Sequence, residues 1–189
     1  MRIITGSARG AKLITLEGEA TRPTAERTKE AIFSMIQFDI EGRRVLDLFA
    51  GSGQLALEAL SRGAAEAVLC DSSKDAAAII NKNAIKTRLL DKVKVHVCDS
   101  YKLIPKLGSK KFDIIFLDPP YALNLIPGAL KLLVQYSNLK PTAIIVCESS
   151  QPEDVFGGDS ELEGRFIIKK KAKYGAAFVT IMSPMEETI

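Results

Sequence analysis

Residues 45–53 read VLDLFAGSG, in which an apolar run passes directly into a glycine-rich loop, as a strand does before a helix in α/β proteins. An amphipathic segment, residues 54–62, follows at once. Further apolar runs and amphipathic segments then alternate along the chain. The runs are residues 67–71, 93–99, 112–118 and 143–148, and the amphipathic segments are residues 73–88, 100–106 and 122–136. This alternation predicts an α/β fold, with a mostly parallel Rossmann-like sheet covered by helices on both faces.

The two ends of the chain follow other patterns. Two β-prone runs, residues 165–173 and 176–183, are separated by Gly175 and predict an antiparallel hairpin at the edge of the sheet. At the N-terminus, short β-prone pieces that could form a second hairpin precede a helical pattern. The β-prone pieces are residues 2–5 and 11–16, and the helical pattern covers residues 24–37. We therefore expect a small N-terminal extension, residues 1–42, and a main domain, residues 43–189.

Composition places the chain among ordinary globular proteins. It has 189 residues, of which 47% are hydrophobic and 26% charged, enough to build a core without disulfides. No apolar run approaches the ~18 residues of a membrane span, and the first residues lack the apolar part of a signal peptide. The three cysteines are widely spaced and form no zinc pattern, so we expect reduced thiols in a cytoplasmic protein.

The net charge of +3 is unevenly distributed. Residues 1–12 and 165–173 together carry eight cationic side chains and no acid, which leaves −5 for the other 168 residues. One charged run is usually a solvated surface. Two basic ends around an acidic centre favour a polyanionic partner.

A carboxylate stands at or near the end of each of the five central runs. In parallel α/β sheets the ligand binds outside the carboxyl ends of the strands, so these side chains are expected to meet in one cleft. Each could instead cap the helix or turn that follows it. Such a cleft would repel a pyrophosphate and suit a cationic ligand. The five residues are Asp47, Asp71, Asp99, Asp118 and Glu148.

The glycine-rich loop indicates a cofactor that contains adenosine. Gly51 and Gly53 fit the dinucleotide fingerprint, and Asp71 lies twenty residues after Gly51. This pattern alone does not separate a nicotinamide dinucleotide from S-adenosylmethionine. The cationic sulfonium and ammonium of S-adenosylmethionine suit an acidic cleft better.

Residues 118–121 read DPPY and follow the fourth central run. Two prolines fix the backbone and remove two N–H donors, which leaves the Asp118 carboxylate and the Pro119 carbonyl as acceptors. Tyr121 adds a flat ring. Two acceptors beside a ring suit an exocyclic NH₂ on a planar base, although a rigid turn is the simpler structural reading.

With these motifs the chain resembles the class I S-adenosylmethionine-dependent methyltransferases that carry a DPPY motif, and more narrowly the bacterial 16S rRNA guanine-N2 methyltransferase family. The resemblance covers nearly the whole chain. It rests on RIITGSARGAKL (2–13), RPTAERTKEAIFSMI (22–36), VLDLFAGSG (45–53), LEALSRGA (57–64), FDIIFLDPPY (112–121) and the Tyr-Gly pair at 174–175. The chain departs from the family pattern at Asp71, where a glutamate is expected, and at Gln54, where a small residue is expected.

The resemblance implies a seven-stranded sheet, S-adenosylmethionine as cofactor with no metal, and 16S rRNA or the assembling small ribosomal subunit as partner. We expect the chain to act as a monomer and to have no membrane partner. The implied catalytic residues are Asp118, Pro119, Pro120 and Tyr121. The implied cofactor-binding residues are Asp47, Phe49, Ala50, Gly51, Gly53, Asp71, Ser72, Asp99 and Ser100, of which Phe49 is also a candidate core residue. The expected RNA-binding residues are Arg2, Arg9, Lys12, Arg22 and Arg27.

Three other functions fit part of the pattern. The chain could methylate another amino group, such as adenine N6 or a protein glutamine, although those enzymes more often carry asparagine in place of Asp118. It could bind the cofactor and RNA without turnover, which leaves the intact DPPY motif unexplained. It could be a nicotinamide-dependent oxidoreductase, which has no need of DPPY. The single histidine, His96, alternates with valines on an expected strand and is assigned no catalytic role.

Overall fold

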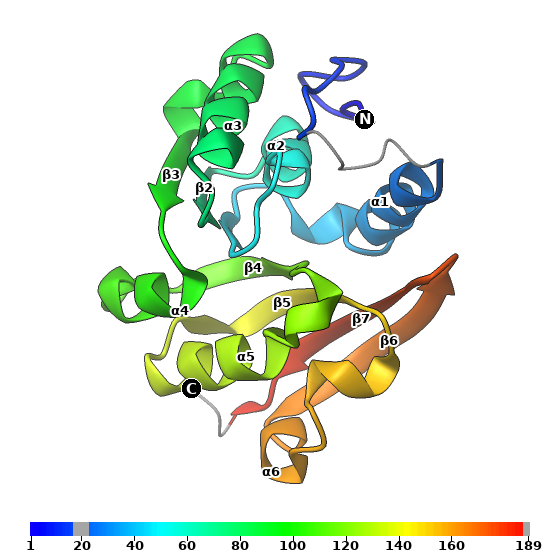
Figure 1. Ribbon diagram of the computed structural model, residues 1–189, viewed down its shortest axis with the longest axis vertical. Coiled ribbons are helices and arrows are strands. Elements are labelled where there is room, and N and C mark those ends of the chain that lie inside the picture. The colour runs from blue at the N-terminus through cyan, green and yellow to red at the C-terminus, as the bar shows by residue number, and fades with distance from the viewer. Residues whose placement is uncertain (17–22, 187–189) are drawn as a thin grey trace.

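The computed structural model describes residues 1–16 and 23–186. Its centre is one sheet whose strand order is β3-β2-β1-β4-β5-β7-β6 (Figure 1). The first five strands run parallel, and β7 runs antiparallel to both β5 and β6. The predicted seven-stranded sheet and its C-terminal hairpin are therefore confirmed. The strands are β1 (Arg44–Asp47), β2 (Glu66–Asp71), β3 (Val93–Val97), β4 (Phe112–Leu117), β5 (Leu139–Ser149), β6 (Phe166–Tyr174) and β7 (Ala177–Pro184).

Helices cover both faces of this sheet (Figure 1). One face carries α1 (Pro23–Met35), α2 (Gln54–Ser61) and α3 (Lys74–Lys86). The other carries α4 (Ser100–Leu103), α5 (Ile126–Gln135) and α6 (Ser160–Glu163). Short 3₁₀ turns connect them: η1 (Gln37–Asp39), η2 (Leu90–Lys92), η3 (Ile104–Leu107), η4 (Tyr121–Leu123) and η5 (Pro152–Val155). The sequence pattern did not predict η5 or α6. Within the described residues no helix is long and apolar enough to cross a membrane.

Strand alternation sorts the core into two layers. Val45, Ile114 and Phe116 pack towards α1, α2 and α3, whereas Leu46 and Ile115 belong to the layer beneath α4 and α5. Both layers are needed because a parallel sheet buries both of its faces. The chain order reverses between the neighbouring strands β1 and β4, which is the topological switch point where α/β folds bind ligands.

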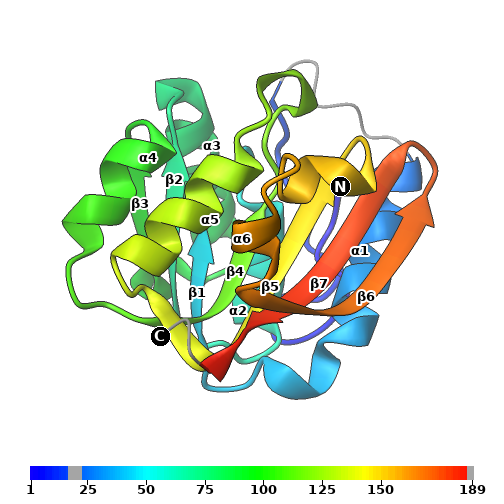
Figure 2. The same ribbon diagram turned by 90° about the horizontal axis from the view of Figure 1, so that it is seen from below.

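The C-terminal hairpin departs from perfect alternation. The register shifts between Ile168 and Lys170, so Lys170 lies opposite Ile181 and Lys171 lies opposite Thr180. Simple alternation predicts that Lys169 shares a face with Lys171. The shift leaves Lys169 out of the pairing instead. Figure 2 shows β6 as the outermost strand on this side of the sheet.

Residues 1–16, the N-terminal arm, pair less than expected. One antiparallel bridge, Arg2 to Lys12, replaces the two expected strands. The reason is that the backbone N–H groups of Ile4 and Thr5 donate to Glu58 on α2, at 2.8 and 3.0 Å, instead of across a hairpin. Ile3 is fully buried in the core layer of α1 and α2. The division at residue 42 stays a prediction.

Candidate active site

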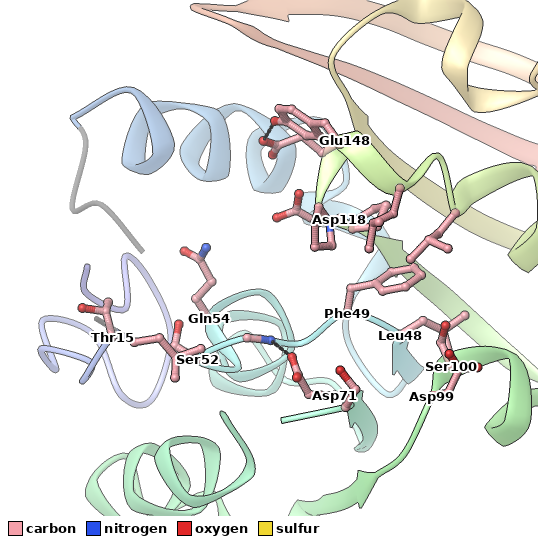
Figure 3. A pocket seen from close by; sticks show the side chains of 18 of the residues that line it. Thr15, Leu48, Phe49, Ser52, Gln54, Asp71, Asp99, Ser100, Asp118 and Glu148 are labelled. Carbon is pink, nitrogen blue, oxygen red and sulfur yellow. Dashed lines mark hydrogen bonds between the residues drawn. The ribbon is translucent and has the colours of Figure 1, made fainter. Parts of the chain in front are cut away.

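A cavity of about 840 Å³ opens at the carboxyl ends of the strands (Figure 3). It spans the switch point between β1 and β4, and the end of the N-terminal arm forms part of its wall. Its lining combines apolar side chains with hydroxyl, amide and carboxyl groups. The lining residues are Met1, Thr15, Leu16, Leu48, Phe49, Gly51, Ser52, Gln54, Asp71, Ser72, Cys98, Asp99, Ser100, Asp118, Pro119, Pro120, Tyr121, Leu123, Leu125 and Glu148.

Four of the five strand-end carboxylates line this cavity, namely those of Asp71, Asp99, Asp118 and Glu148. Asp47 does not line it, which corrects the expectation that all five would meet in the cleft. Its side chain is 1% exposed, and it accepts hydrogen bonds from the backbone N–H groups of Phe49 and Ala56. Asp47 therefore braces the glycine loop from beneath. Burial raises the pKa of its carboxyl to about 7.

Within the glycine loop, Gly51 lines the cavity and Gly53 does not. Both have positive φ angles, of 51° and 78°. A Cβ on Gly53 would approach Ile80 Cγ1 to 3.2 Å and Leu69 Cδ2 to 3.3 Å, so this glycine allows α2 to start close to β2 and α3. Neither Gly53 nor the buried Ala50, whose carbonyl accepts from Gly53 N at 2.7 Å, lines the cavity, and both shape the loop from behind. Their expected contact with the cofactor stays a prediction.

Asp71 links the glycine loop to the cavity wall. Its Oδ2 accepts from Gly51 N at 2.9 Å, and its Oδ1 accepts from Ser73 N at 2.9 Å. A carboxylate offers about four acceptor sites, so each oxygen retains capacity for one more donor. This matches the pair of hydroxyls on a ribose. The shorter aspartate thus reaches the backbone of the glycine loop.

Asp99 and Ser100 stand at the start of α4. Asp99 Oδ1 caps this helix by accepting from Tyr101 N at 2.9 Å and Lys102 N at 3.2 Å. The simple capping role is therefore real for Asp99. The same residue also lines the cavity, next to the buried Ser100, so capping and ligand contact can coexist.

All four DPPY residues line the cavity at the end of β4. Tyr121 is 40% exposed, and its hydroxyl donates to Glu148 Oε1 at 2.7 Å (Figure 3). Burial raises the pKa of the Glu148 carboxyl, and burial and this hydrogen bond raise the pKa of Tyr121. A flat ring is thus tethered through its hydroxyl in the cavity wall that Asp118 also lines.

Sequence reasoning assigned no role to two polar side chains of the site. Glu148 was counted as a cleft carboxylate but was given no role. It lies two residues beyond Val146 on β5, and strand alternation places both on one face. Gln54 was noted only as a departure from the family pattern. Its Oε1 is buried without a hydrogen-bond partner among the described residues, and Figure 3 shows its side chain between Thr15 and Asp118.

Four of the five expected RNA-binding cations are described by the structure, and none of these four lines the cavity. Arg9, Lys12 and Arg27 are exposed, whereas Arg2 forms an ion pair with Glu26 at 2.7 Å. Arg22 lies outside the described residues. These positions leave the RNA assignment as a prediction.

The cysteines and the histidine stand apart from the chemistry. All three cysteines are free thiols, although Cys98 reaches the cavity wall. His96 lies on β3 outside the cavity. Within the described part of the chain, no three His, Cys, Asp or Glu side chains gather as a metal site would need.

Comparison with known proteins decides the family. The family model described as Conserved hypothetical protein 95 matches residues 1–183. The chain belongs to this family. One relative is YlbH of Bacillus subtilis, which is named as a putative rRNA methyltransferase. It is 34% identical over 183 residues, which cover 96% of this chain and 97% of YlbH.

Two further relatives of the family agree with this assignment. Ribosomal RNA small subunit methyltransferase D of Haemophilus influenzae is 37% identical over 154 residues, covering 80% of this chain and 79% of that protein. The solved structure of yhhF from Escherichia coli superposes with a TM-score of 0.84 at 28% identity, over 98% of both chains. The predicted family resemblance is therefore confirmed.

Proposed function

We propose that the chain transfers a methyl group from S-adenosylmethionine to the exocyclic N2 amine of a guanine in 16S rRNA. The observation that carries this proposal is the DPPY segment beside the glycine loop in one cavity, with Tyr121 held by Glu148. The relatives named as ribosomal RNA methyltransferases support an RNA substrate.

The cavity fits the proposed cofactor on its own chemistry. Asp71 offers acceptors for two ribose hydroxyls, Asp99 and Ser100 offer polar atoms for the adenine edge, and Gly51 allows close approach to the methionine part. Four carboxylates suit a ligand that carries a sulfonium and an ammonium group. When bound, S-adenosylmethionine supplies an electrophilic methyl group.

The chain itself would prepare the nitrogen. The lone pair of guanine N2 is delocalised into the ring, so the amine is a poor nucleophile. We assign the Asp118 carboxylate and the Pro119 carbonyl oxygen as acceptors for its two N–H bonds, which localises the lone pair. Tyr121 would stack on a base drawn out of its helix, and Pro120 keeps the segment rigid. Asp118 can also take the proton that the nitrogen gives up. Positioning of this kind contributes effective molarities of roughly 10⁵–10⁸ M.

RNA would reach this acidic cavity through cations placed outside it. We assign that role first to Arg9, Lys12 and Arg27, which are exposed. Arg2 would need to exchange its Glu26 partner for a phosphate. We further propose that the chain acts as a monomer in the cytoplasm, on the assembling small subunit.

The proposal is tested by transfer of a tritiated methyl group to fractionated RNA, followed by nucleoside analysis. The expected product is N2-methylguanosine in 16S rRNA. Methylated adenine or methylated protein would instead identify the alternative acceptor, and absence of transfer would contradict enzymatic function.

The catalytic assignment is tested by Asp118→Ala. Loss of a preorganised acceptor should lower the single-turnover rate by about 10²–10³-fold, while calorimetry should show nearly unchanged binding of S-adenosylhomocysteine. Asp75→Ala, an exposed aspartate on α3, is the matched control. A rate near that of the wild type in Asp118→Ala would refute the role of Asp118.

A further inference from the structure

A second hollow, of about 260 Å³, lies on the α4 side of the sheet beside the edge strand β3. Its floor is apolar, because Val68, Leu103 and Leu107 are buried there. Its walls carry three exposed lysines, Lys94, Lys106 and Lys110. The second hollow therefore combines an apolar base with a cationic rim.

The fold gathers these lysines from separate segments. Lys94 lies on β3, Lys106 on η3, and Lys110 in the loop before β4. No aspartate or glutamate lines the second hollow, and none of the three lysines forms an ion pair with another described residue. The charge is therefore not neutralised from within the described chain.

His96 also lines the second hollow and is affected by the positive charge of these lysines. Burial lowers the pKa of its imidazole, and the charges of Lys94 and Lys110 lower it further. Two cations thus act on the imidazole from two segments. An anion placed between them would relieve their mutual repulsion.

We propose that the second hollow binds the phosphate backbone of RNA. This inference rests on the proposed function and adds a contact that the N-terminal arm cannot provide. The four carboxylates of the active-site cavity repel phosphates, so the backbone of a bound strand must lie beside the cavity. Cys98 lines both the cavity and the second hollow, so one residue separates the two spaces. Lysines bind phosphates as point charges, and the apolar floor suits the sugar or base next to them.

The test uses the full chain and a fluorescein-labelled 20-nucleotide RNA of mixed sequence. Affinity is measured by anisotropy between about 50 and 200 mM salt for the wild type and for the double variant Lys106→Gln with Lys110→Gln. Lys82→Gln with Lys86→Gln, which removes two exposed charges from α3, is the matched control. Unchanged binding of S-adenosylhomocysteine verifies that each variant is folded.

Each lost phosphate contact flattens the log–log salt slope by roughly 0.7 for a single strand. Two lost contacts therefore flatten it by about 1.4 and weaken binding about 25-fold near 0.1 M salt. Support requires this change in the double variant and little change in the control. Equal loss in both variants would reveal only general charge attraction and overturn the proposal.

Two further outcomes separate this site from other ligands and from the proposed function. If AMP binds the wild type saturated with S-adenosylhomocysteine but not the double variant, and RNA affinity is unchanged, the second hollow is a nucleotide site and the RNA assignment is wrong. If the wild type methylates RNA and both variants bind RNA as it does, this inference fails alone. A wild type that neither binds nor methylates RNA overturns the proposed function as well.

Discussion

Asp47 is a buried carboxylate, and its charge in the folded chain changes with pH near 7. Its Oδ1 has no hydrogen-bond partner among the described residues, so the ionised form loses hydration without full replacement. Burial moves its pKa from 3.8 to about 7 in the folded chain. A raised carboxyl pKa means that the folded state holds a proton that the unfolded state releases. This stabilising contribution is complete below pH 3.8 and is lost as pH rises through about 7.

The variant Asp47→Asn has no titrating group at this position, so comparing it with the wild type isolates the contribution of Asp47 to the free energy of unfolding. Relative to the variant, the wild type should lose up to about 1.4 kcal/mol of unfolding free energy per pH unit between the two pKa values, and then level off. Denaturant unfolding of both proteins at a series of pH values measures the difference. A difference that stays constant over this range would show that Asp47 keeps its charge when folded.

Glu148 accepts a hydrogen bond from the Tyr121 hydroxyl, and we expect this bond to orient the ring. Glu148→Ala removes the acceptor and should raise the KM for RNA more than it lowers kcat, because the ring loses its fixed angle. Hydrogen bonds to charged groups contribute about 1.5–3 kcal/mol, so we expect roughly a tenfold or greater effect on kcat/KM. Glu148→Gln retains an acceptor and should recover part of the activity.

Tyr121→Phe is the matched variant for this pair, since it removes the donor and keeps the ring. If the hydrogen bond acts only through Tyr121, Glu148→Ala should have little further effect in the Tyr121→Phe background. Independent, additive effects of the two substitutions would show that Glu148 contacts RNA or cofactor directly.

At the scale of elements, α2 anchors the N-terminal arm through Glu58. This side chain is fully buried, forms ion pairs with Lys29 at 3.3 Å and Arg62 at 2.8 Å, and accepts from Ile4 N and Thr5 N. Lys29 Nζ also donates to the Arg2 carbonyl. Burial lowers the pKa of the Lys29 amine, and the nearby Glu58 carboxylate opposes that shift. One glutamate therefore connects two helices and the arm.

Glu58→Gln should cost about 3–5 kcal/mol of unfolding free energy, because it leaves Lys29 as a buried charge without its counter-ion. Glu66→Gln breaks the Arg44–Glu66 pair, which is about half exposed, and should cost no more than about 1 kcal/mol. Denaturant unfolding compares the two variants. Hydrogen exchange at the Ile4 and Thr5 amides should accelerate in Glu58→Gln alone, and equal costs would mean that Glu58 does not anchor the arm.

Local pattern was enough to predict the central elements. Apolar runs predicted β1 to β5, and DPPY after β4 predicted a rigid segment at the switch point. Glu58 could not be recognised, because LALEALS is an ordinary amphipathic pattern and its burial depends on an arm over fifty residues away. The unpaired Lys169 could not be recognised either, because a register shift depends on the partner strand. The family resemblance implied that Asp47 supports the glycine loop, but only packing showed that Asp47 and Gly53 do not line the cavity.

Over the whole molecule, charge is separated by location. Carboxylates line the cavity, whereas cations occupy the arm, the second hollow and the edge strand β6. The lysines of β6 have a structural use, since charged side chains on an open edge prevent pairing with another sheet. This use accounts for these lysines without an RNA contact, so the arm is the first candidate to test.

Arg9→Ala with Lys12→Ala should weaken RNA binding and flatten its salt slope by about 0.7–0.9 for each lost contact. Both side chains are exposed, and neither has an ion pair within the described residues. Binding of S-adenosylhomocysteine should not change. Salt titrations parallel to those of the wild type, with equal affinity, would remove the arm from the RNA surface.

The arm is attached to the body largely through its main chain. Ile4, Thr5 and Ser7 donate backbone N–H groups to α2, and a Cβ on Gly6 would lie 1.8 Å from the Ser61 carbonyl oxygen. Such an attachment depends little on which side chains face outward. The tip of the arm can accordingly change its sequence over evolution, or be exchanged by design, while the arm stays attached to α2. A binding loop is grafted onto a constant framework in the same way. Gly6 is the position that such a graft must keep.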